Sequence, residues 1–213
     1  GDELAEMGTP VEPWQIRDSN GPTLDSLLGT KSWLEIIQRK HIKDNLEEVI
    51  QQLRQAIDIS DAVILTGGVS MGDTDYVPEA IQSIGGEIVF HRLPIRPGRP
   101  VLGASVAGKP ILGLPGNPVS VAVTARVIAL PVLMYTAGVA EISPCHSAVL
   151  QNPDDKTIPL TWFRLVRNTK AGIELVPSRG SGDVVSLGAS DGFIRFEPGV
   201  SGSGSGPWPL YLW

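Results

Sequence analysis

The stretch Asp61-Ala62-Val63-Ile64-Leu65-Thr66-Gly67-Gly68-Val69-Ser70-Met71-Gly72-Asp73-Thr74-Asp75-Tyr76 decides the fold of this chain. Its first residues form a short, mostly apolar run of the kind that is buried on both faces of a parallel sheet. A glycine-rich segment follows, and apolar residues then recur at helical spacing (Val77, Ala80, Ile81 and Ile84). The stretch therefore predicts a strand, a glycine loop and a helix that Thr74 or Asp75 caps.

This strand, loop and helix indicate a phosphate cradle with its own metal ligands. Glycine lets backbone N–H groups turn toward an anion, and the positive end of the helix dipole faces the loop. Two aspartates would repel a bare phosphate, but they fit a bound Mg²⁺, which is usually held by one or two carboxylates plus phosphate oxygens. An ordinary strand-to-helix turn with capping aspartates is the alternative interpretation. The candidate phosphate-site residues are Gly67, Gly68, Ser70, Gly72 and Asp73, and the candidate metal ligands are Asp73 and Asp75.

The composition of the 213 residues is that of a globular protein. A net charge of -6 with 42% hydrophobic residues argues against a general nucleic-acid or membrane-surface role. The single cysteine, Cys145, excludes an internal disulfide and favours a cytoplasmic location. The three histidines are scattered and form no ligand pattern (His41, His91 and His146). The acidic start is unlike a signal peptide, and no uninterrupted apolar run reaches the roughly 18 residues of a membrane span.

Helices and strands alternate through the first part of the chain. We expect a short helix around Leu24–Leu28, a strand over Leu34–Ile37 and an amphipathic helix over Asp44–Ile57, all before the strand of the opening stretch. This order predicts an α/β fold with a doubly wound, mostly parallel sheet, whose ligands gather at the carboxyl ends of the strands.

The rest of the chain divides into an apolar part and a β-rich part. We expect a strand over Glu87–Leu93, a hairpin of Pro100–Ala104 with Pro110–Leu112, and an apolar helix over Val119–Met134 that is buried in the core or in a subunit interface. From about Ala140 the pattern predicts a second, small, all-β domain. Its expected strands are Trp162–Val166, Ile173–Val176, Gly192–Phe196 and Leu210–Trp213.

Two further loops carry chemistry. Arg96 and Arg99 lie on a turn that prolines stiffen, and arginine forks suit phosphate or carboxylate groups. A second glycine loop, Gly113–Pro118, ends a strand and begins the apolar helix, with Asn117 as its cap. A solvated hairpin and a well-capped core helix are the alternative interpretations. Together with the first glycine loop, these features predict an anion site at one edge of the sheet.

Five motifs taken together resemble the molybdenum insertases, the family of bacterial molybdopterin molybdenumtransferase (MoeA) and of the E domain of gephyrin. The likeness continues into Gly180-Ser181-Gly182-Asp183, so that the chain is similar to the C-terminal half of the family's proteins. The five motifs are Gly1-Asp2-Glu3-Leu4, Asp18-Ser19-Asn20, Thr66 to Tyr76, Arg96-Pro97-Gly98-Arg99-Pro100 and Gly113-Leu114-Pro115-Gly116-Asn117-Pro118-Val119-Ser120.

The resemblance implies a molybdopterin-binding, three-layer α/β sandwich over residues 1–139 and a small β-barrel domain over residues 140–213. The implied reaction is insertion of molybdate into adenylylated molybdopterin, with Mg²⁺-assisted release of AMP. The resemblance assigns catalytic positions to Glu3, Asp75, Pro115 and Pro118. It assigns cofactor-binding positions to Gly67, Gly68, Ser70, Gly72, Asp73, Arg96, Arg99, Gly116, Asn117 and Ser120. It also implies a homodimer in the cytoplasm, with molybdopterin adenylyltransferase and molybdoenzyme apoproteins as partners.

The chain departs from the family pattern in two respects. The family's N-terminal domains and the first strand of its sheet do not precede Gly1, so we interpret the chain as a fragment. Asp44-Asn45 stands where the family often has paired aspartates, and an amide cannot ionise. The alternative functions are an anchoring module of the gephyrin type, a molybdopterin adenylyltransferase-like binding domain, and a generic nucleotide- or sugar-phosphate-binding domain.

Overall fold

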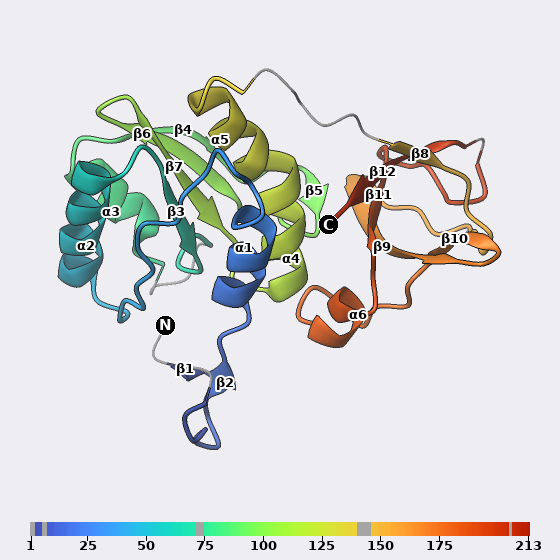
Figure 1. Cartoon of the computed structure of the whole chain (residues 1–213), viewed down its shortest axis with the longest axis horizontal. Helices are drawn as coiled ribbons and strands as arrows, with labels where there is room; N and C mark the ends of the chain where they lie inside the picture. The colour runs from blue at the N-terminus through green and yellow to red at the C-terminus, as the bar shows by residue number, and fades with distance from the viewer. Residues whose placement is uncertain (1–2, 6–7, 71–74, 140–145, 205) are drawn as a thin grey trace.

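A computed structural model describes residues 3–5, 8–70, 75–139, 146–204 and 206–213. The chain forms two lobes, which Figure 1 shows side by side. The α/β lobe (residues 3–139) holds a four-stranded sheet with helices on both sides. The barrel lobe (residues 146–213) is built almost entirely of strands.

The sheet of the α/β lobe has the order β3-β7-β6-β4. Its strands are β3 (Val63–Thr66), β7 (Lys109–Leu114), β6 (Leu102–Val106) and β4 (Glu87–His91). Only β3 and β7 pair in parallel, whereas β6 runs antiparallel to both β7 and β4. The prediction of a mostly parallel sheet is therefore wrong for the described strands, because the predicted hairpin β6–β7 reverses the chain at Ala107-Gly108, where both residues have positive φ.

Helices cover both faces of this sheet and make the predicted three layers. On one face lie α2 (Leu46–Ile59) and α3 (Val77–Ser83), and on the other lie α1 (Asn20–Leu28) and a long helix that starts at Pro118. Neighbouring residues of β7 show the division: Ile111 packs with α2 and α3, whereas Leu112 packs with the other helices. This alternation is the period of two that a strand imposes.

The predicted strand at Leu34–Ile37 is wrong. The described residues of that segment have no ladder partner, and the chain runs as irregular structure until Asn45 caps α2. A strand exists only when a neighbour completes its hydrogen bonds, so an apolar run without such a neighbour stays irregular. The outer edge of β3 has no strand beside it in the described part of the chain.

The long apolar helix is continuous from Pro118 to Thr136, with a change of winding in its middle. It consists of α4 (Pro118–Thr124), the π-helical segment η1 (Ala125–Ala129) and α5 (Leu130–Thr136). The N–H of Leu130 reaches back five residues to the Ala125 carbonyl, next to Pro131, which has no N–H to donate. By length and composition this helix passes the test for a membrane span, but 56% of its most apolar window is buried inside the structure. It is a core helix here.

The barrel lobe is a closed sheet. Its strands are β8 (His146–Ala148), β9 (Thr161–Thr169), β10 (Gly172–Leu175), β11 (Gly192–Phe196) and β12 (Trp208–Leu212). They lie in the order β10-β9-β11-β12-β8, and a bridge between Leu150 and Ile173 joins the two ends. The short helix α6 (Val184–Gly188) completes the lobe. The all-β part that the sequence pattern predicts and the small barrel that the resemblance implies are thus confirmed.

The two lobes share structure and a core. β5 (Ile95–Arg96), from the α/β lobe, pairs in parallel with β9 of the barrel sheet. Phe163 and Phe193 of the barrel lobe belong to the same hydrophobic cluster as Leu112 of β7 and Val121 of α4. A small parallel pair of β1 (Leu4–Ala5) and β2 (Ile16–Arg17) projects from the α/β lobe beside the N-terminus (Figure 1).

Candidate functional site

The carboxyl ends of three strands meet at one edge of the sheet. β3 and β7 run in parallel, and two successive antiparallel pairings give β4 the same direction. The loops that follow these strands are the first glycine loop after β3, the second glycine loop after β7 and the arginine turn after β4. The topology therefore brings together the three loops that the sequence singled out.

The first glycine loop has a backbone that needs glycine. Gly67 and Gly68 have φ of +80° and +66°, a region that other residues rarely adopt. The Gly67 N–H donates to the Leu114 carbonyl at 3.0 Å, which joins the end of β3 to the end of β7. The next residue, Val69, is 1% exposed and packs against Gly113, where an added Cβ would lie 2.6 Å from Val69 Cγ1. The loop is thus anchored to the sheet by an apolar side chain.

The helix after this loop begins later than predicted. Its N-cap position is Tyr76, one residue after Asp75, and the Tyr76 side chain makes no capping bond. Thr74, the other predicted cap, lies outside the described residues. Pro78 in the first turn needs no N–H partner, and the Val77 N–H donates to the Gly68 carbonyl at 3.2 Å. Gly72 and Asp73 lie outside the described residues.

The second glycine loop touches the first. A Cβ added at Gly116 would lie 3.8 Å from the Gly67 Cα. The Asn20 side chain, which is 7% exposed, donates to the Gly116 carbonyl at 2.7 Å and so ties the start of α1 to this loop. Asp18 caps the same helix start, because its carboxylate accepts the N–H groups of Asn20 and Gly21 at 3.0 and 3.1 Å. No local sequence signal indicates the contact between Asn20 and Gly116, which are 96 positions apart.

A barrel-lobe loop covers the start of α4. Asn117 occupies the N-cap position, but its side chain makes no capping bond in the described structure and instead donates to the Ser181 hydroxyl at 2.9 Å. The Val119 N–H donates to the Ser181 carbonyl at 3.0 Å, so one free N–H of the helix start is already used. Asp183 fixes this loop, and hydrogen bonds from the N–H groups of Arg179 and Ser186 lower the pKa of its carboxyl.

Three further predicted site residues belong to this loop and to the first turn of α4. Pro115 and Ser120 are buried, and Pro118 is half-buried in the first turn of α4. The Ser120 carbonyl accepts a hydrogen bond from the Thr124 hydroxyl at 2.7 Å. The predicted Asn117 cap is therefore replaced by a contact between the lobes, which local sequence could not show.

The arginine turn presents two charges that no described residue neutralises by an ion pair. Arg96 and Arg99 are exposed, and neither makes an ion pair with any residue that the structure describes. The turn is packed tightly, because a Cβ at Gly98 (φ +107°) would lie 2.4 Å from the Thr124 methyl group of α4. Two guanidinium groups on a fixed turn can bind an anion from solution.

His91 is a further residue of this edge, which the sequence showed only as one of three scattered histidines without a ligand pattern. It ends β4, and its Nε2 lies 2.7 Å from the Val69 carbonyl, so the imidazole N–H donates to the first glycine loop. The contact joins residues that are 22 positions apart. No local pattern indicates it.

An open groove of about 1310 Å³ runs along β3 and over the two glycine loops. Five predicted site residues line it: Glu3, Gly67, Gly68, Asp75 and Gly116. The residues that line the groove do not include Ser70, the two arginines or Pro115, Asn117, Pro118 and Ser120. The structure therefore separates the predicted site into a groove with carboxylates and a neighbouring arginine turn.

The groove offers oxygen donors of the kind that Mg²⁺ prefers. The carboxylates of Glu3, Asp18 and Asp75 line it beside the glycine loops. Among the described residues no group of three or more His, Cys, Asp or Glu side chains lies close enough to form a metal cage. This donor set suits an ion that keeps water and phosphate oxygens as ligands and takes only one or two carboxylates from the protein.

Comparisons with known proteins agree with this geometry. A family model described as "Probable molybdopterin binding domain" matches residues 1–135. Curated proteins named molybdopterin molybdenumtransferase are 34% identical in Staphylococcus aureus, over 97% of this chain and 50% of their own length, and 35% identical in Staphylococcus epidermidis, with the same coverage. The chain thus spans about half the length of these relatives.

Solved structures give the same result. A crystal structure of the molybdopterin biosynthesis MoeA protein from Pyrococcus horikoshii matches with a TM-score of 0.79 and 25% identity, over 98% of this chain and 50% of that one. A second structure of that protein matches in fold, with a TM-score of 0.76 and 23% identity. Because the family model covers more than half of the residues and the fold agrees over nearly all of them, the chain belongs to the family of molybdopterin-binding domains.

Proposed function

We propose that this chain takes part in molybdenum cofactor biosynthesis as the molybdopterin-binding part of a molybdopterin molybdenumtransferase. The proposed reaction inserts molybdate into adenylylated molybdopterin and releases AMP, and it depends on Mg²⁺. One observation carries the proposal: two glycine loops in mutual contact lie at the same edge of the sheet as two arginines without ion-pair partners among the described residues. The curated relatives that carry this activity in their names support it.

The arginine turn and the glycine loops would bind the phosphate groups. In a chain of net charge -6, an anion needs local cations, and Arg96 and Arg99 supply two of them. Gly67, Gly68 and Gly116 leave room for the substrate to approach the backbone. Ser70, Gly72, Asn117 and Ser120 complete the proposed binding residues. Pro115 and Pro118 would hold the second loop in shape, because proline fixes φ and removes a backbone donor.

The carboxylates would hold the metal ion. Asp75, together with Asp73, is the proposed ligand pair, and Glu3 lines the groove with Asp75. When bound, Mg²⁺ would neutralise charge on the adenylyl pyrophosphate. The residues of this chain would hold the pterin and the adenylyl group of the substrate in place. Asn45 adds no charge, because an amide does not ionise. Its side-chain oxygen accepts the Glu48 N–H at 3.0 Å and caps α2.

We also propose that residues 1–139 and 140–213 form two domains, that the protein is a homodimer and that it is located in the cytoplasm. The long helix no longer supports the dimer, because its apolar side chains pack in the chain's own core. Molybdopterin adenylyltransferase would supply the substrate, and molybdoenzyme apoproteins would receive the product.

The test is an assay of AMP release with adenylylated molybdopterin, run with and without molybdate and Mg²⁺, beside a binding titration with molybdopterin and with ATP. The proposal predicts saturable binding of molybdopterin and AMP release that needs both additions. Preference for ATP would instead indicate a generic nucleotide-binding domain. Failure of the folded protein to bind the pterin, together with saturable binding of a receptor peptide, would contradict the proposal in favour of an anchoring module.

A further inference from the structure

An indole of the barrel lobe lies against the arginine turn of the α/β lobe. In the parallel pairing of β5 with β9, Arg96 is opposite Trp162, and the Thr161 N–H donates to the Pro94 carbonyl at 3.0 Å. The Arg96 Cζ lies 6.0 Å from the centroid of the Trp162 ring. This is the outer range of a cation–π interaction. The side chain of Arg96 therefore reaches from one lobe to an aromatic face of the other.

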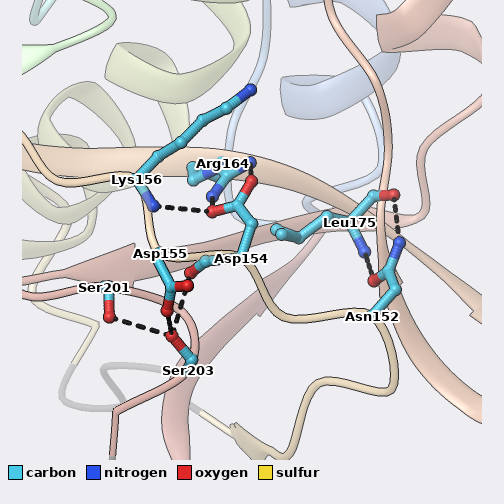
Figure 2. Close-up of polar contacts among 8 residues, drawn as sticks. All are labelled: Asn152, Asp154, Asp155, Lys156, Arg164, Leu175, Ser201 and Ser203. Atoms are coloured by element: carbon cyan, nitrogen blue, oxygen red, sulfur yellow. Dashed lines mark hydrogen bonds and ion pairs between the residues drawn. The ribbon is translucent and has the colours of Figure 1, made fainter.

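The Trp162 ring is itself held in place from the barrel side. The Arg164 Cζ lies 4.5 Å from the same ring centroid, and this side chain is only 14% exposed. Figure 2 shows the Arg164 guanidinium forked onto the Asp154 carboxylate, with N–H···O distances of 2.6 and 2.8 Å. Because Asp154 compensates the charge of Arg164, the same indole can face a second guanidinium with reduced repulsion between the two cations.

The loop that carries Asp154 is fixed in turn. The Ser203 N–H donates to the Asp154 carbonyl at 3.2 Å, and the Ser203 hydroxyl donates to the Asp155 carboxylate (Figure 2). The described residues around Ser203 thus lie against the Asp154–Asp155 segment. Contacts thus connect the Asp154–Asp155 segment with Arg164, Arg164 with Trp162, and Trp162 with Arg96.

Among these contacting residues, Arg96 is exposed and has no ion-pair partner in the described part of the protein. An exposed arginine loses rotamer freedom when it binds an anion, and a contact that orders it beforehand reduces that loss. We propose that Trp162 is a positioning residue for Arg96, so that the barrel lobe takes part in anion binding through an aromatic contact. The proposal rests on the proposed function, in which Arg96 binds a phosphate of the pterin substrate.

The first test needs no ligand. Nuclear magnetic resonance of the arginine Nε–H groups reports the ring current that Trp162 exerts on Arg96. The Arg96 resonance is expected to move to the position of a free arginine in Trp162→Ala and to stay displaced in Trp162→Phe, which keeps an aromatic face. Trp208→Ala is the matched control, because it removes another indole of the same lobe. The Trp208 ring packs on Phe196, with 4.8 Å between the ring centroids. An Arg96 resonance that Trp162→Ala leaves unchanged would overturn the proposal.

The second test uses molybdopterin as the probe in a binding titration. Loss of an exposed cation–π contact predicts about two- to fivefold weaker binding for Trp162→Ala. Trp162→Phe should restore most of the affinity, and Trp162→Ala should have no further effect in an Arg96→Ala background. Equal losses with and without Arg96 would mean a purely structural role and would contradict the proposal. If the unaltered protein binds no pterin, the proposed function fails, and the resonance test alone decides the role of Trp162.

Discussion

Removal of the Phe193 ring should destabilise both lobes together. Phe193 is fully buried in the cluster that also contains Leu112 of β7 and Val121 of α4. Its ring lies 5.6 Å from Phe163 in an edge-on arrangement and 5.0 Å from Tyr211 in a stack. A buried Phe→Ala change costs about 3–5 kcal/mol, and such aromatic pairs place this site at the upper end of that range.

Urea unfolding measures this cost in each lobe separately. Fluorescence of a variant that keeps Trp213 as its single tryptophan follows the barrel lobe, because the Trp213 ring lies 5.1 Å from Phe193, and circular dichroism follows the helices of the α/β lobe. With a slope of roughly 2–3 kcal/mol per molar, a loss of about 4 kcal/mol lowers the midpoint by roughly 1.3–2 M. The shared core predicts that both signals shift by the same amount.

Phe193→Leu is the matched control, because it retains most of the apolar volume and should cost about 1.5 kcal/mol or less. The reasoning would be refuted if Phe193→Ala cost no more than Phe193→Leu. It would also be refuted if the dichroism midpoint stayed in place while the fluorescence midpoint fell, since the lobes would then unfold independently.

Three further changes test other parts of the structure. Gly113→Ala forces Val69 to move, so it should lower the free energy of unfolding by about 1–3 kcal/mol in a thermal melt and weaken pterin binding. Unchanged binding would contradict the idea that packing of Val69 on β7 positions the first glycine loop. Asn45→Ala removes the cap of α2 and should cost about 1 kcal/mol in urea, while Asn45→Asp keeps the cap; equal losses in the two variants would contradict the capping role. The hydrogen bond from Arg164 lowers the pKa of Asp154 below 3.8, so its stabilisation is complete above that pH and is lost as the pH falls through the lowered pKa. Asp154→Asn should therefore show a flatter loss of stability in acid, and an unchanged acid limb would contradict this assignment.

Local signals predicted the elements that depend on local structure. The helix expected over residues 44–57 is α2, displaced by two residues, because its apolar stripe and its cap lie within the segment itself. The hairpin β6–β7 was predicted from its alternating residues and from the turn at Ala107-Gly108. The glycine loops and the arginine turn were predicted to lie at one sheet edge, and the topology confirms that placement.

Nonlocal pairing explains what could not be predicted. Leu34–Ile37 has the composition of a strand but no neighbour in the described structure, and a sequence does not show whether a neighbour exists. The contact of Asn20 with Gly116 spans 96 positions, and the contact of Asn117 with Ser181 spans 64. The first contact depends on how α1 packs beside the second glycine loop and the second on how the two lobes pack, rather than on any motif.

The central claim is that the arginine turn and the glycine loops form the anion-binding half of a pterin site. The most direct measurement is a calorimetric titration with molybdopterin, with and without Mg²⁺, of the unaltered chain and of Arg96→Ala/Arg99→Ala. Arg54→Ala, an exposed arginine on α2, is the matched control. The account predicts saturable binding that the double change weakens at least tenfold and that Arg54→Ala leaves intact. Equal affinity in all three folded proteins would contradict it.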